Sequence, residues 1–399
     1  MTTERLFYSD PYQREFTAAV VRMEAVTGKY HVVLDRTAFY PDAGGQLCDT
    51  GCLGGIPVEN VIEQNGEIVH VLPEPPPGET VKGSLDWPVR FDHMQQHAGQ
   101  HILSQAFLRT AGGETVSFHM GQNVSSIDIA VPGLSAEDAA AAEDAANGVV
   151  FGGGAIRTFW AAKDELANYH LRKPPVQAGP IRLVAIAGFD LCPCGGTHPA
   201  TCGEVGLIKI RKTERIRGNT RVHFYCGWRA LVDYRWKNEM INNISTTLTI
   251  RDRELDDAFA RLTEKNRVLQ GDVGFLRRQL HQYQADGLWA AASVHNGVHI
   301  VRHVFPDENP AGLKEIAALL TARPATVALL GATGDGVHLV FARSEDTGGN
   351  MGHLLRAAAA AVDGKGGGSA RSAQGGGSRP EELPAALAAA DAALRKEIS

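Results

Sequence analysis

Two pairs of residues in this chain have the spacing of metal ligands. His97 and His101 are four residues apart in a segment of helical periodicity, so both imidazoles project from one face of a helix, one turn apart. Cys194 and His198 are also four apart, in a glycine-rich turn. Three imidazoles and a thiolate form a four-coordinate set, and this mixture of nitrogen and sulfur favours Zn2+ over iron or another transition metal. Each pair alone is more often a set of ordinary side chains, so the prediction of a metal site depends on their combination.

A second candidate site lies in the glycine-rich stretch from Asp35 to Gly51. Its polar residues and glycines are Thr37, Gly44, Gly45, Gln46 and Asp49. Glycines admit backbone conformations that other residues resist, and they let a ligand approach the main chain. The stretch is therefore interpreted either as the wall of a binding pocket or as a long hairpin loop.

The elements that position these residues predict the fold class α+β. Residues 1–90 alternate apolar and polar side chains between turn signals, which is typical of a small, strongly curved sheet or partial β-barrel. Its strands are expected at 18–23, 31–34, 58–62 and 67–72. Residues 91–230 are expected to form an α/β domain around the metal site. Its predicted elements are an amphipathic helix at 90–109, two strands within 115–130 joined at Gly121, a helix at 132–147 capped by Ser135, and strands at 181–187 and 206–210.

Residues 231–290 predict a helical linker. Leucines recur every seven residues, at Leu248, Leu255, Leu262, Leu269 and Leu276. A second set stands four positions after the later ones, at Phe259, Asn266, Val273 and Leu280. This pattern predicts a coiled coil, which forms either within one chain or as a homodimer through residues 245–280. Gly271 and Gly274 each disfavour helix by about 1 kcal/mol relative to alanine, so a bend or hairpin could form there.

Residues 291–399 predict a further α/β domain. Strands are expected at 298–304, 326–330 and 337–342, and helices at 312–320 and 352–362. The glycine-rich segment 363–377 is interpreted either as a flexible linker or as a loop that binds an anion with Lys365 and Arg371, before a helix that starts near Pro380 or Pro384. It lacks the Gly-Lys-Ser/Thr pattern of a P-loop, and no dependence on ATP is expected.

The composition limits the class of protein. With 44% apolar and 21% charged residues, the chain fits an ordinary globular protein of two to four domains. No apolar run approaches the roughly 18 residues of a membrane span, so no membrane partner is expected. Six cysteines in 399 residues are no disulfide framework and fit a reducing cytoplasm. The net charge of −6 argues against a protein coated in nucleic acid but allows a local basic stripe.

Three sequence patterns in a fixed order resemble a known family. Phe39-Tyr40-Pro41 with Gly44-Gly45-Gln46 comes first, the HxxxH pair second, and Cys-Gly-Gly-Thr-His at 194–198 third. This order resembles the editing domain of alanyl-tRNA synthetases and, most closely, their free-standing relatives, the AlaX alanyl-tRNA editing proteins. The C-terminal part is similar to a domain shared by alanyl-tRNA synthetases and DHH phosphoesterases, although no Asp-His-His motif precedes it. The resemblance therefore covers essentially the whole chain, as in long-form AlaX proteins.

The resemblance implies roles for individual residues. It implies that one Zn2+ is held by His97, His101, Cys194 and His198, where Cys192 is the competing thiolate without a histidine at the right offset. It also implies an aminoacyl pocket shaped by Thr37, Gly44, Gly45 and Gln46, with Ala43 where the family often has a third glycine. Thr37 would hydrogen-bond a serine hydroxyl, and Gln46 would help to hold the attacking water.

The most cationic part of the chain is the run from Lys209 to Arg221. Its predicted phosphate contacts are Lys209, Arg211, Lys212, Arg215 and Arg217. A charge run is usually a solvated hairpin, but beside a zinc pocket in a protein that resembles a tRNA editor we expect contact with phosphates.

The expected function is hydrolysis of the aminoacyl ester of mischarged tRNA(Ala), chiefly Ser-tRNA(Ala) and then Gly-tRNA(Ala), in the cytoplasm. The partner is the acceptor end of tRNA(Ala), and editing in a separate site is needed because a synthetase pocket rejects near-isosteres poorly. Two alternatives stay open. One is a non-catalytic tRNA-binding or assembly protein in which zinc only staples the fold, and the other is a metal hydrolase of small esters.

Overall fold

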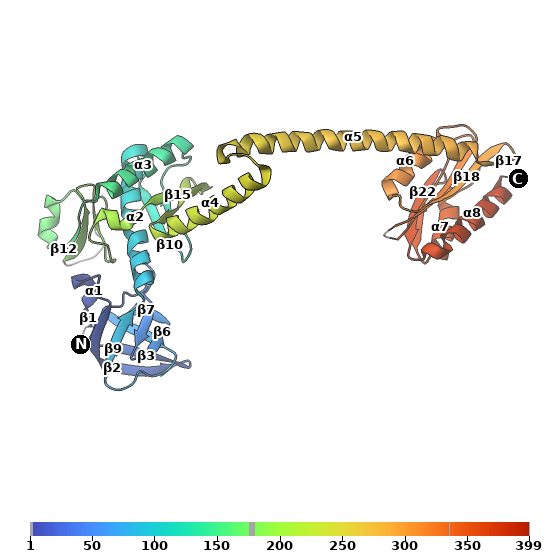
Figure 1. Ribbon diagram of the computed structural model, residues 1–399. Coiled ribbons are helices and arrows are strands. Elements are labelled where there is room, and N and C mark those ends of the chain that lie inside the picture. Colours follow the sequence, from blue (N-terminus) through green and yellow to red (C-terminus); the bar gives the residue numbers. More distant parts are fainter. Residues whose placement is uncertain (1–2, 175–179, 335, 399) are drawn as a thin grey trace. The chain divides into compact units, whose positions relative to one another are not determined.

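The protein divides into two compact units in the computed structural model, one ending at Thr249 and the other beginning at Ile250. The structure describes residues 3–174, 180–334 and 336–398. Figure 1 shows the mixed composition of each unit, in which helices pack on β-sheets. The predicted α+β class is confirmed. None of the described helices is long and apolar enough to cross a membrane.

A seven-stranded antiparallel sheet opens the first unit. Its strands are β2 (Glu15–Val26), β3 (Lys29–Leu34), β5 (Gly51–Leu53), β6 (Ile56–Val58), β7 (Asn60–Gln64), β8 (Glu67–Leu72) and β9 (Thr80–Leu85). They pair in the order β6-β5-β9-β2-β3-β8-β7, and β6 also approaches β8, so the sheet nearly closes. Alternate side chains such as Val32 and Leu34 point into its core. The curved sheet is as predicted, although the strand expected at 58–62 is interrupted at Glu59.

Short elements before and inside this sheet hold the glycine-rich stretch. β1 (Glu4–Arg5) pairs in parallel with β4 (Arg36–Thr37), and α1 (Leu6–Ser9) follows β1 directly. Arg36 is exposed, but the chain from Thr37 to Tyr40 is buried, so the stretch passes through the core before it reaches the glycines.

The central helix α2 (Trp87–Ala111) carries both histidines, as predicted. It is not amphipathic over the metal-ligand motif, because every residue from His93 to Ser104 is buried. Gly99 shows the reason, since a Cβ there would lie 2.2 Å from Cys226 Sγ of the neighbouring strand. An amphipathic helix has one polar face open to solvent, and this part of α2 has no such face.

Two sheets and one helix surround α2. One sheet has the order β10-β11-β16-β15 and contains β10 (Thr115–Met120), β11 (Ser125–Ile129), β15 (Ile208–Ile216) and β16 (Asn219–Cys226). The other has the order β12-β13-β14 and contains β12 (Ile156–Ala161), β13 (Ile181–Ile186) and β14 (Asp190–Pro193). The helix α3 (Ala136–Gly152) begins after the predicted cap Ser135, whose hydroxyl accepts from Asp138 N, and it runs past the expected end at residue 147.

The region 231–290, predicted to be helical, forms two helices, and the break between them lies elsewhere than at the predicted glycines. α4 (Trp228–Leu248) ends the first unit, and α5 (Leu255–Ala290) begins the second. The bend expected at Gly271 and Gly274 is wrong, because α5 continues through both glycines. The helix is instead interrupted after Leu248, where Thr249 adopts a left-handed conformation with φ 55°. Along α5 the heptad residues Leu262, Leu269 and Leu276 are about half exposed, so the coiled coil stays a prediction.

A six-stranded sheet in the order β17-β18-β19-β20-β22-β21 forms the core of the second unit. Its strands are β17 (Ser293–His295), β18 (Val298–Phe305), β19 (Thr326–Thr333), β20 (Val337–Arg343), β21 (Lys365–Gly368) and β22 (Ser372–Gly377). The helices α7 (Met351–Ala361) and α8 (Leu383–Glu397) cover one face, and α6 (Pro310–Thr321) with the end of α5 covers the other. The predicted strands and helices of this domain are present.

The glycine-rich segment 363–377 is neither a linker nor an open loop. It forms the hairpin of β21 and β22, which pairs with β20 at the edge of the sheet. A Cβ on Gly366 would lie 2.3 Å from Leu355, and one on Gly377 would lie 2.3 Å from the carbonyl oxygen of Val362. The glycines are needed because helix α7 packs directly on the backbone of this hairpin. Arg371 forms an ion pair with Glu345, so this cation already has a partner.

Candidate metal centre

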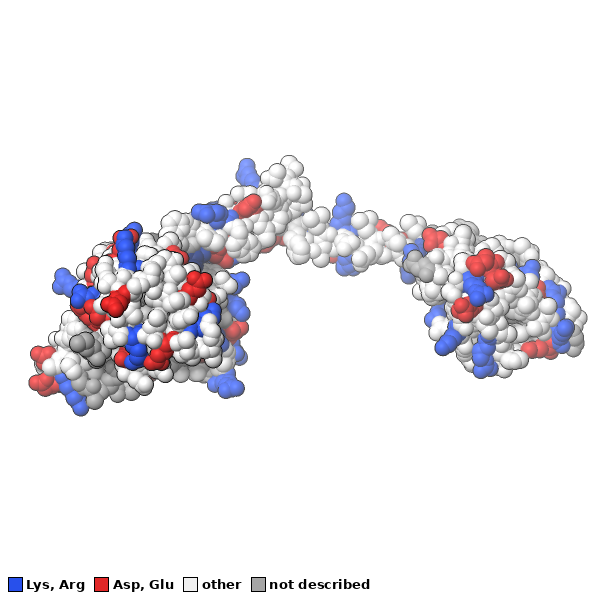
Figure 2. All heavy atoms as spheres, turned by 90° about the horizontal axis from the view of Figure 1, so that it is seen from below, with Lys and Arg blue, Asp and Glu red and all other residues white. Residues whose placement is uncertain are grey.

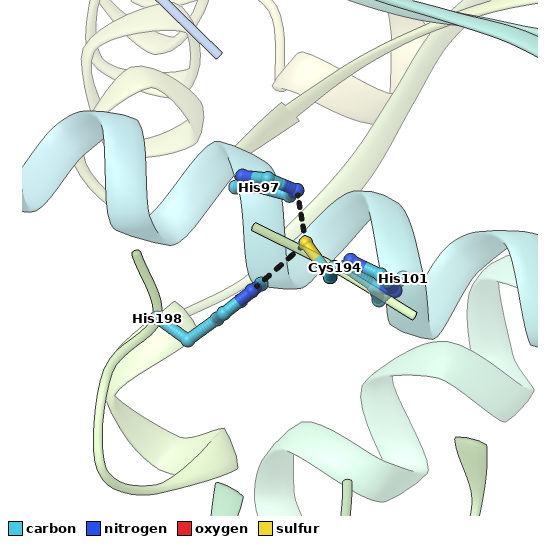
Figure 3. Close-up of side chains that lie close together, drawn as sticks. All are labelled: His97, His101, Cys194 and His198. Carbon is cyan, nitrogen blue, oxygen red and sulfur yellow. Dashed lines mark hydrogen bonds between the residues drawn. The ribbon is translucent and has the colours of Figure 1, made fainter. Parts of the chain in front are cut away.

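His97, His101, Cys194 and His198 lie together although about a hundred residues separate the two pairs. One ligand atom from each lies within 4.8 Å of the others. The Cys194 Sγ is 3.2 Å from Nε2 of His97 and 3.3 Å from Nε2 of His198. Ligands of one tetrahedral zinc are separated by roughly 3.5 Å, since Zn–S and Zn–N bonds are about 2.3 and 2.0 Å long. Figure 3 shows the Cys194 sulfur between the ring of His97, on α2, and the ring of His198, in the loop that follows β14.

Gln46 orients His97 from the glycine-rich stretch. Its fully buried Oε1 lies 2.7 Å from Nδ1 of His97 and also accepts from Thr197 N, while its Nε2 donates to Thr197 Oγ1. A hydrogen bond at Nδ1 leaves the Nε2 lone pair of His97 free for a metal. Gly196 makes this possible, because a Cβ there would lie 2.0 Å from the His97 ring. Gly196, the second glycine of the Cys-Gly-Gly-Thr-His pattern, is therefore needed because no side chain fits beside the His97 ring.

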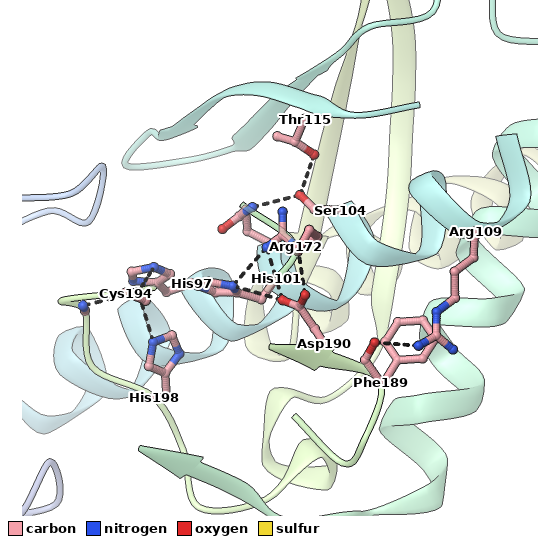
Figure 4. A network of polar contacts seen from close by, with 12 residues as sticks. His97, His101, Ser104, Arg109, Thr115, Arg172, Phe189, Asp190, Cys194 and His198 are labelled. Carbon is pink, nitrogen blue, oxygen red and sulfur yellow. Dashed lines mark hydrogen bonds and ion pairs between the residues drawn. The ribbon is translucent and has the colours of Figure 1, made fainter. Parts of the chain in front are cut away.

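Asp190 orients His101 in the same way. Its buried carboxylate is 3.3 Å from Nδ1 of His101 and is held by two hydrogen bonds from Arg172, of 2.8 and 3.1 Å. Figure 4 shows this chain of contacts behind the cluster. The Nε2 of His101 is buried without a hydrogen-bond partner among the described residues, as expected for a nitrogen that binds a metal ion. The donor set and its supports fit a bound metal ion.

The electrostatics of the cluster also suit a cation. Burial opposes ionisation of the Cys194 thiol, but the imidazoles of His97, His198 and His101 hold the pKa of this thiol well below its ordinary value. Burial lowers the pKa of His198 to about 3, so its imidazole is neutral. Burial also opposes protonation of His101, yet Cys194 and Asp190 raise the pKa of His101 well above its ordinary value. A metal ion and this proton therefore compete for the same imidazole.

A cavity of about 700 Å3 lies against Cys194. Its walls come from distant parts of the chain, namely Tyr8 of α1, Gly44 of the glycine-rich stretch, Trp160 of β12 and Arg182 of β13. Gly45 instead lies against Phe118, to which a Cβ would approach within 3.0 Å. Cys194, alone among the four residues of the cluster, and Gly44 of the predicted pocket therefore line one cleft.

A buried ion pair fixes the glycine-rich stretch to the central helix. Asp49 and Arg90 are both fully buried, and the Arg90 Nε donates to both carboxylate oxygens, at 2.9 and 3.0 Å. Asp49 also accepts from Tyr40 N at 2.6 Å. Because an unpaired buried charge is strongly destabilising, this pair holds the loop in register with α2.

Thr37 is fully buried and does not line this cavity. Its Oγ1 lies 2.9 Å from His70 Nε2 and accepts from Phe39 N at 3.1 Å. His70 Nδ1 faces the carbonyl oxygen of Val32, and burial lowers the pKa of His70 to about 4, so the neutral ring accepts the threonine proton at Nε2. Among the described contacts, one lone pair of the Thr37 hydroxyl has no partner, although the side chain is closed off from the cavity.

The basic run lies on β15 and its turn, away from the residues that line the cavity. Lys209 pairs with Glu143, and Lys212 pairs with Glu214. Among the described residues, Arg211, Arg215 and Arg217 form no ion pair. On the face shown in Figure 2, basic and acidic side chains are interspersed over the surface. The hairpin is thus partly neutralised rather than uniformly cationic.

Several residues of the site were not predicted from the sequence. Asp190 stands four residues before Cys194 on an extended segment, so alternation along the strand was the one available signal. Thr197 lies inside the Cys-Gly-Gly-Thr-His pattern, which gave it no role of its own, while Arg172, Arg182 and Trp160 come to the site through tertiary contacts that carry no local pattern. Cys192, the competing thiolate, lines the cavity but is not part of the group of four.

The comparisons with known proteins agree with this geometry. Residues 181–222, which include Cys194 and His198, match the threonyl and alanyl tRNA synthetase second additional domain, and residues 296–396 match the DHHA1 domain. The alanyl-tRNA editing protein AlaX-L of Pyrococcus horikoshii is 31% identical over 396 residues, which cover 95% of this chain and 96% of that protein. The chain belongs to the AlaX-L family of alanyl-tRNA editing proteins.

Other relatives of this chain are alanine–tRNA ligases. That of Pyrococcus abyssi is 33% identical over 293 residues, which cover 70% of this chain but 32% of the ligase. The solved C-Ala domain of Aquifex aeolicus alanyl-tRNA synthetase is 26% identical to this chain, with a TM-score of 0.25. The matched part covers 26% of this chain and 97% of that domain. Family membership confirms the resemblance that the three ordered sequence patterns indicated.

Proposed function

We propose that this protein hydrolyses the ester bond of mischarged tRNA(Ala), chiefly Ser-tRNA(Ala), with Gly-tRNA(Ala) as a second substrate. The observation that carries this proposal is the convergence of His97, His101, Cys194 and His198 beside a cleft, in a member of a family of alanyl-tRNA editing proteins. The similar protein of Pyrococcus horikoshii is an alanyl-tRNA editing protein, which supports a charged tRNA as the substrate. The reaction needs water as its second substrate, and a cytoplasmic location fits it.

The proposed cofactor is one Zn2+, held by the Nε2 atoms of His97 and His101, by Cys194 Sγ and by His198. Bound there, zinc would supply Lewis-acid polarisation or a fixed position for the acceptor end. Four protein ligands are typical of a closed site, so positioning is the role that the donor set favours. The Oε1 of Gln46 is occupied by His97, and one hydrogen of its Nε2 is donated to Thr197. The second hydrogen of Nε2 would hold the attacking water.

Thr37 is the proposed determinant of serine over alanine, which requires the serine side chain to reach past the residues that line the cleft to a buried hydroxyl. Its hydroxyl donates to His70 and accepts from Phe39 N, which leaves one lone pair to accept the hydroxyl proton of serine. Alanine has no hydroxyl, so cognate Ala-tRNA(Ala) would gain nothing at this position. A polar contact of this kind discriminates far better than an apolar pocket does.

Two further roles are proposed for the rest of the chain. Arg211 and Arg215 of β15 and Arg217 of the following turn form no ion pair with the described residues, and they would contact tRNA phosphates together with Lys209 and Lys212. The exposed heptad residues of α5, within 245–280, would pair two copies of the chain as a homodimer, since an apolar stripe with a seven-residue period suits a second helix.

The test is a deacylation assay with tRNA(Ala) charged with serine, glycine or alanine. The proposal predicts rapid release of serine, slower release of glycine and little release of alanine. Binding of charged tRNA without any turnover would instead indicate the non-catalytic assembly protein. Equal hydrolysis of a seryl ester that lacks the tRNA body would indicate a hydrolase of small esters.

A further inference from the structure

The helix α4 carries an apolar surface that is open to solvent. Its exposed large apolar side chains are Trp228, Leu231, Val232, Tyr234, Trp236, Met240 and Ile244. Trp228 is 60% exposed and Trp236 is 48% exposed, so each indole leaves a large area to water. Tryptophan and tyrosine dominate the energetics of binding interfaces, and a continuous apolar patch marks such an interface. This helix is therefore a candidate contact surface.

Five of these side chains form one row along the helix. They follow one another at intervals of four residues, as Trp228, Val232, Trp236, Met240 and Ile244. At 1.5 Å per residue, the row extends over about 24 Å. Rows of side chains four residues apart are the ridges with which one helix packs into the grooves of another. The row therefore indicates a helix as the partner.

Grooves lie on both sides of the first half of this ridge. One, of about 350 Å3, lies between the ridge and the turn that joins β10 to β11. The other, of about 470 Å3, lies beside Leu231 and Tyr234. Trp228 borders both grooves, whereas Met240 and Ile244 form the second half of the ridge. A helix with grooves at one end and apolar knobs at the other fits an antiparallel copy of itself.

The charges beside the ridge are also self-complementary. Arg235 and Glu239 flank it on one side, and neither forms an ion pair within the described parts of the chain. On the other side, Asp233 and Lys237 pair with each other. If two α4 helices pack antiparallel with Trp236 at the centre, Arg235 of one copy lies near Glu239 of the other, twice over. Opposite charges that face each other across an interface fix its register.

We propose that α4 is an interface between two copies of this chain, packed antiparallel across a two-fold axis near Trp236. The two Trp236 rings meet at the axis, and Met240 and Ile244 of each copy enter the grooves beside Trp228 of the other. A two-fold contact uses the same patch on both copies, which is why the patch has to complement itself. This interface is distinct from the α5 pairing proposed for residues 245–280, and it does not depend on the editing function.

The first test is the dissociation constant of the full-length dimer, measured by analytical ultracentrifugation. Trp236→Ala should raise this constant at least tenfold, because a central tryptophan is the kind of residue on which such contacts depend. Phe151→Ala is the matched control, since Phe151 is 75% exposed but lies on α3, and it should leave the constant unchanged. A wild type that is monomeric at every concentration, or an unaltered constant in Trp236→Ala, would overturn the proposal.

A charge exchange between two variants tests the antiparallel register. Arg235→Glu alone, or Glu239→Arg alone, places like charges opposite each other in the dimer and should weaken self-association a few-fold. A mixture of the two variants should associate more tightly than either does alone, because opposite charges then face each other at both places. Effects within one helix cannot produce this gain between chains. A mixture that associates no better than its components would contradict the arrangement.

Two comparisons separate this interface from other occupants of the ridge. Leu269→Glu places a charge in the heptad seam of α5. If it dissociates the dimer while Trp236→Ala does not, α5 alone pairs the copies and the proposed α4 interface is wrong. Binding of uncharged tRNA is measured in the same variants. If Trp236→Ala weakens tRNA binding and leaves self-association unchanged, the ridge contacts nucleic acid and the proposal is likewise wrong.

Discussion

The metal cluster of the first unit and the glycine-rich segment of the second both stood out as candidate sites in the sequence, but the structure gives them different roles. At the cluster, residues from α2 and from the loop after β14 converge, and His97 and His101 of α2 have supporting partners in Gln46 and Asp190. At residues 363–377, the glycines form an edge hairpin on which α7 packs. Paired residues with ligand chemistry therefore predict a site better than a run of glycines, which serves close backbone packing equally well.

The largest effect is expected from removal of two ligands at once. His97→Ala combined with Cys194→Ala leaves only two donors, and the resulting loss of metal should lower the rate of Ser-tRNA(Ala) deacylation by about a thousandfold, since a bound metal contributes several kcal/mol. Rates are measured by release of labelled serine. Cys192→Ala, which removes the neighbouring thiol, should keep the metal. Normal turnover in the double variant would remove the cluster from the mechanism.

A smaller effect is expected when a support, rather than a ligand, is changed. Asp190→Asn removes the charge that orients His101 and should weaken Zn2+ binding about 10- to 100-fold in competition with a chelator. Asp128→Asn is the control, because Asp128 also pairs with an arginine, Arg221, but lies on the sheet away from the cluster. Equal zinc affinity in Asp190→Asn and the wild type would mean that His101 is held in another way.

The glycine-rich hairpin offers a comparison of neighbouring positions. Gly366→Ala would place a Cβ 2.3 Å from Leu355 and should lower the free energy of unfolding of the second unit by about 1–3 kcal/mol. Gly367→Ala meets nothing within 4 Å and should be tolerated. Denaturant unfolding measures both variants, and neither should change metal content. Similar stability of the two variants would contradict the packing explanation for these glycines.

The smallest effect is expected at the basic hairpin. Replacement of Arg211, Arg215 and Arg217 by alanine should raise KM for charged tRNA a few-fold and reduce the salt dependence of binding by about one unit of slope per lost phosphate contact. Arg22→Ala, on the N-terminal sheet, is the control. An unchanged salt slope would show that these arginines do not contact the nucleic acid.

Local patterns predicted the positions of the ligands but not their surroundings. The spacing of His97 and His101 fixes one helical face, and alternation predicted most strands of both units. The burial of α2 from His93 to Ser104 could not be predicted, because it depends on packing partners such as Cys226 that are distant in the sequence. Arg182 and Trp160 likewise meet only through strand pairing. The continuity of α5 through Gly271, where the helix is exposed, shows that the helix-forming residues around a glycine outweigh its cost of about 1 kcal/mol.

The most direct test of a shared metal site is the metal content of the purified protein, measured by mass spectrometry of the metal together with the absorption of a cobalt-substituted sample. One Zn2+ per chain is expected, with cobalt bands of a four-coordinate site that includes one thiolate, and both should vanish in the variant that lacks His97 and Cys194. Absence of stoichiometric metal, or metal that persists in that variant, would contradict the account.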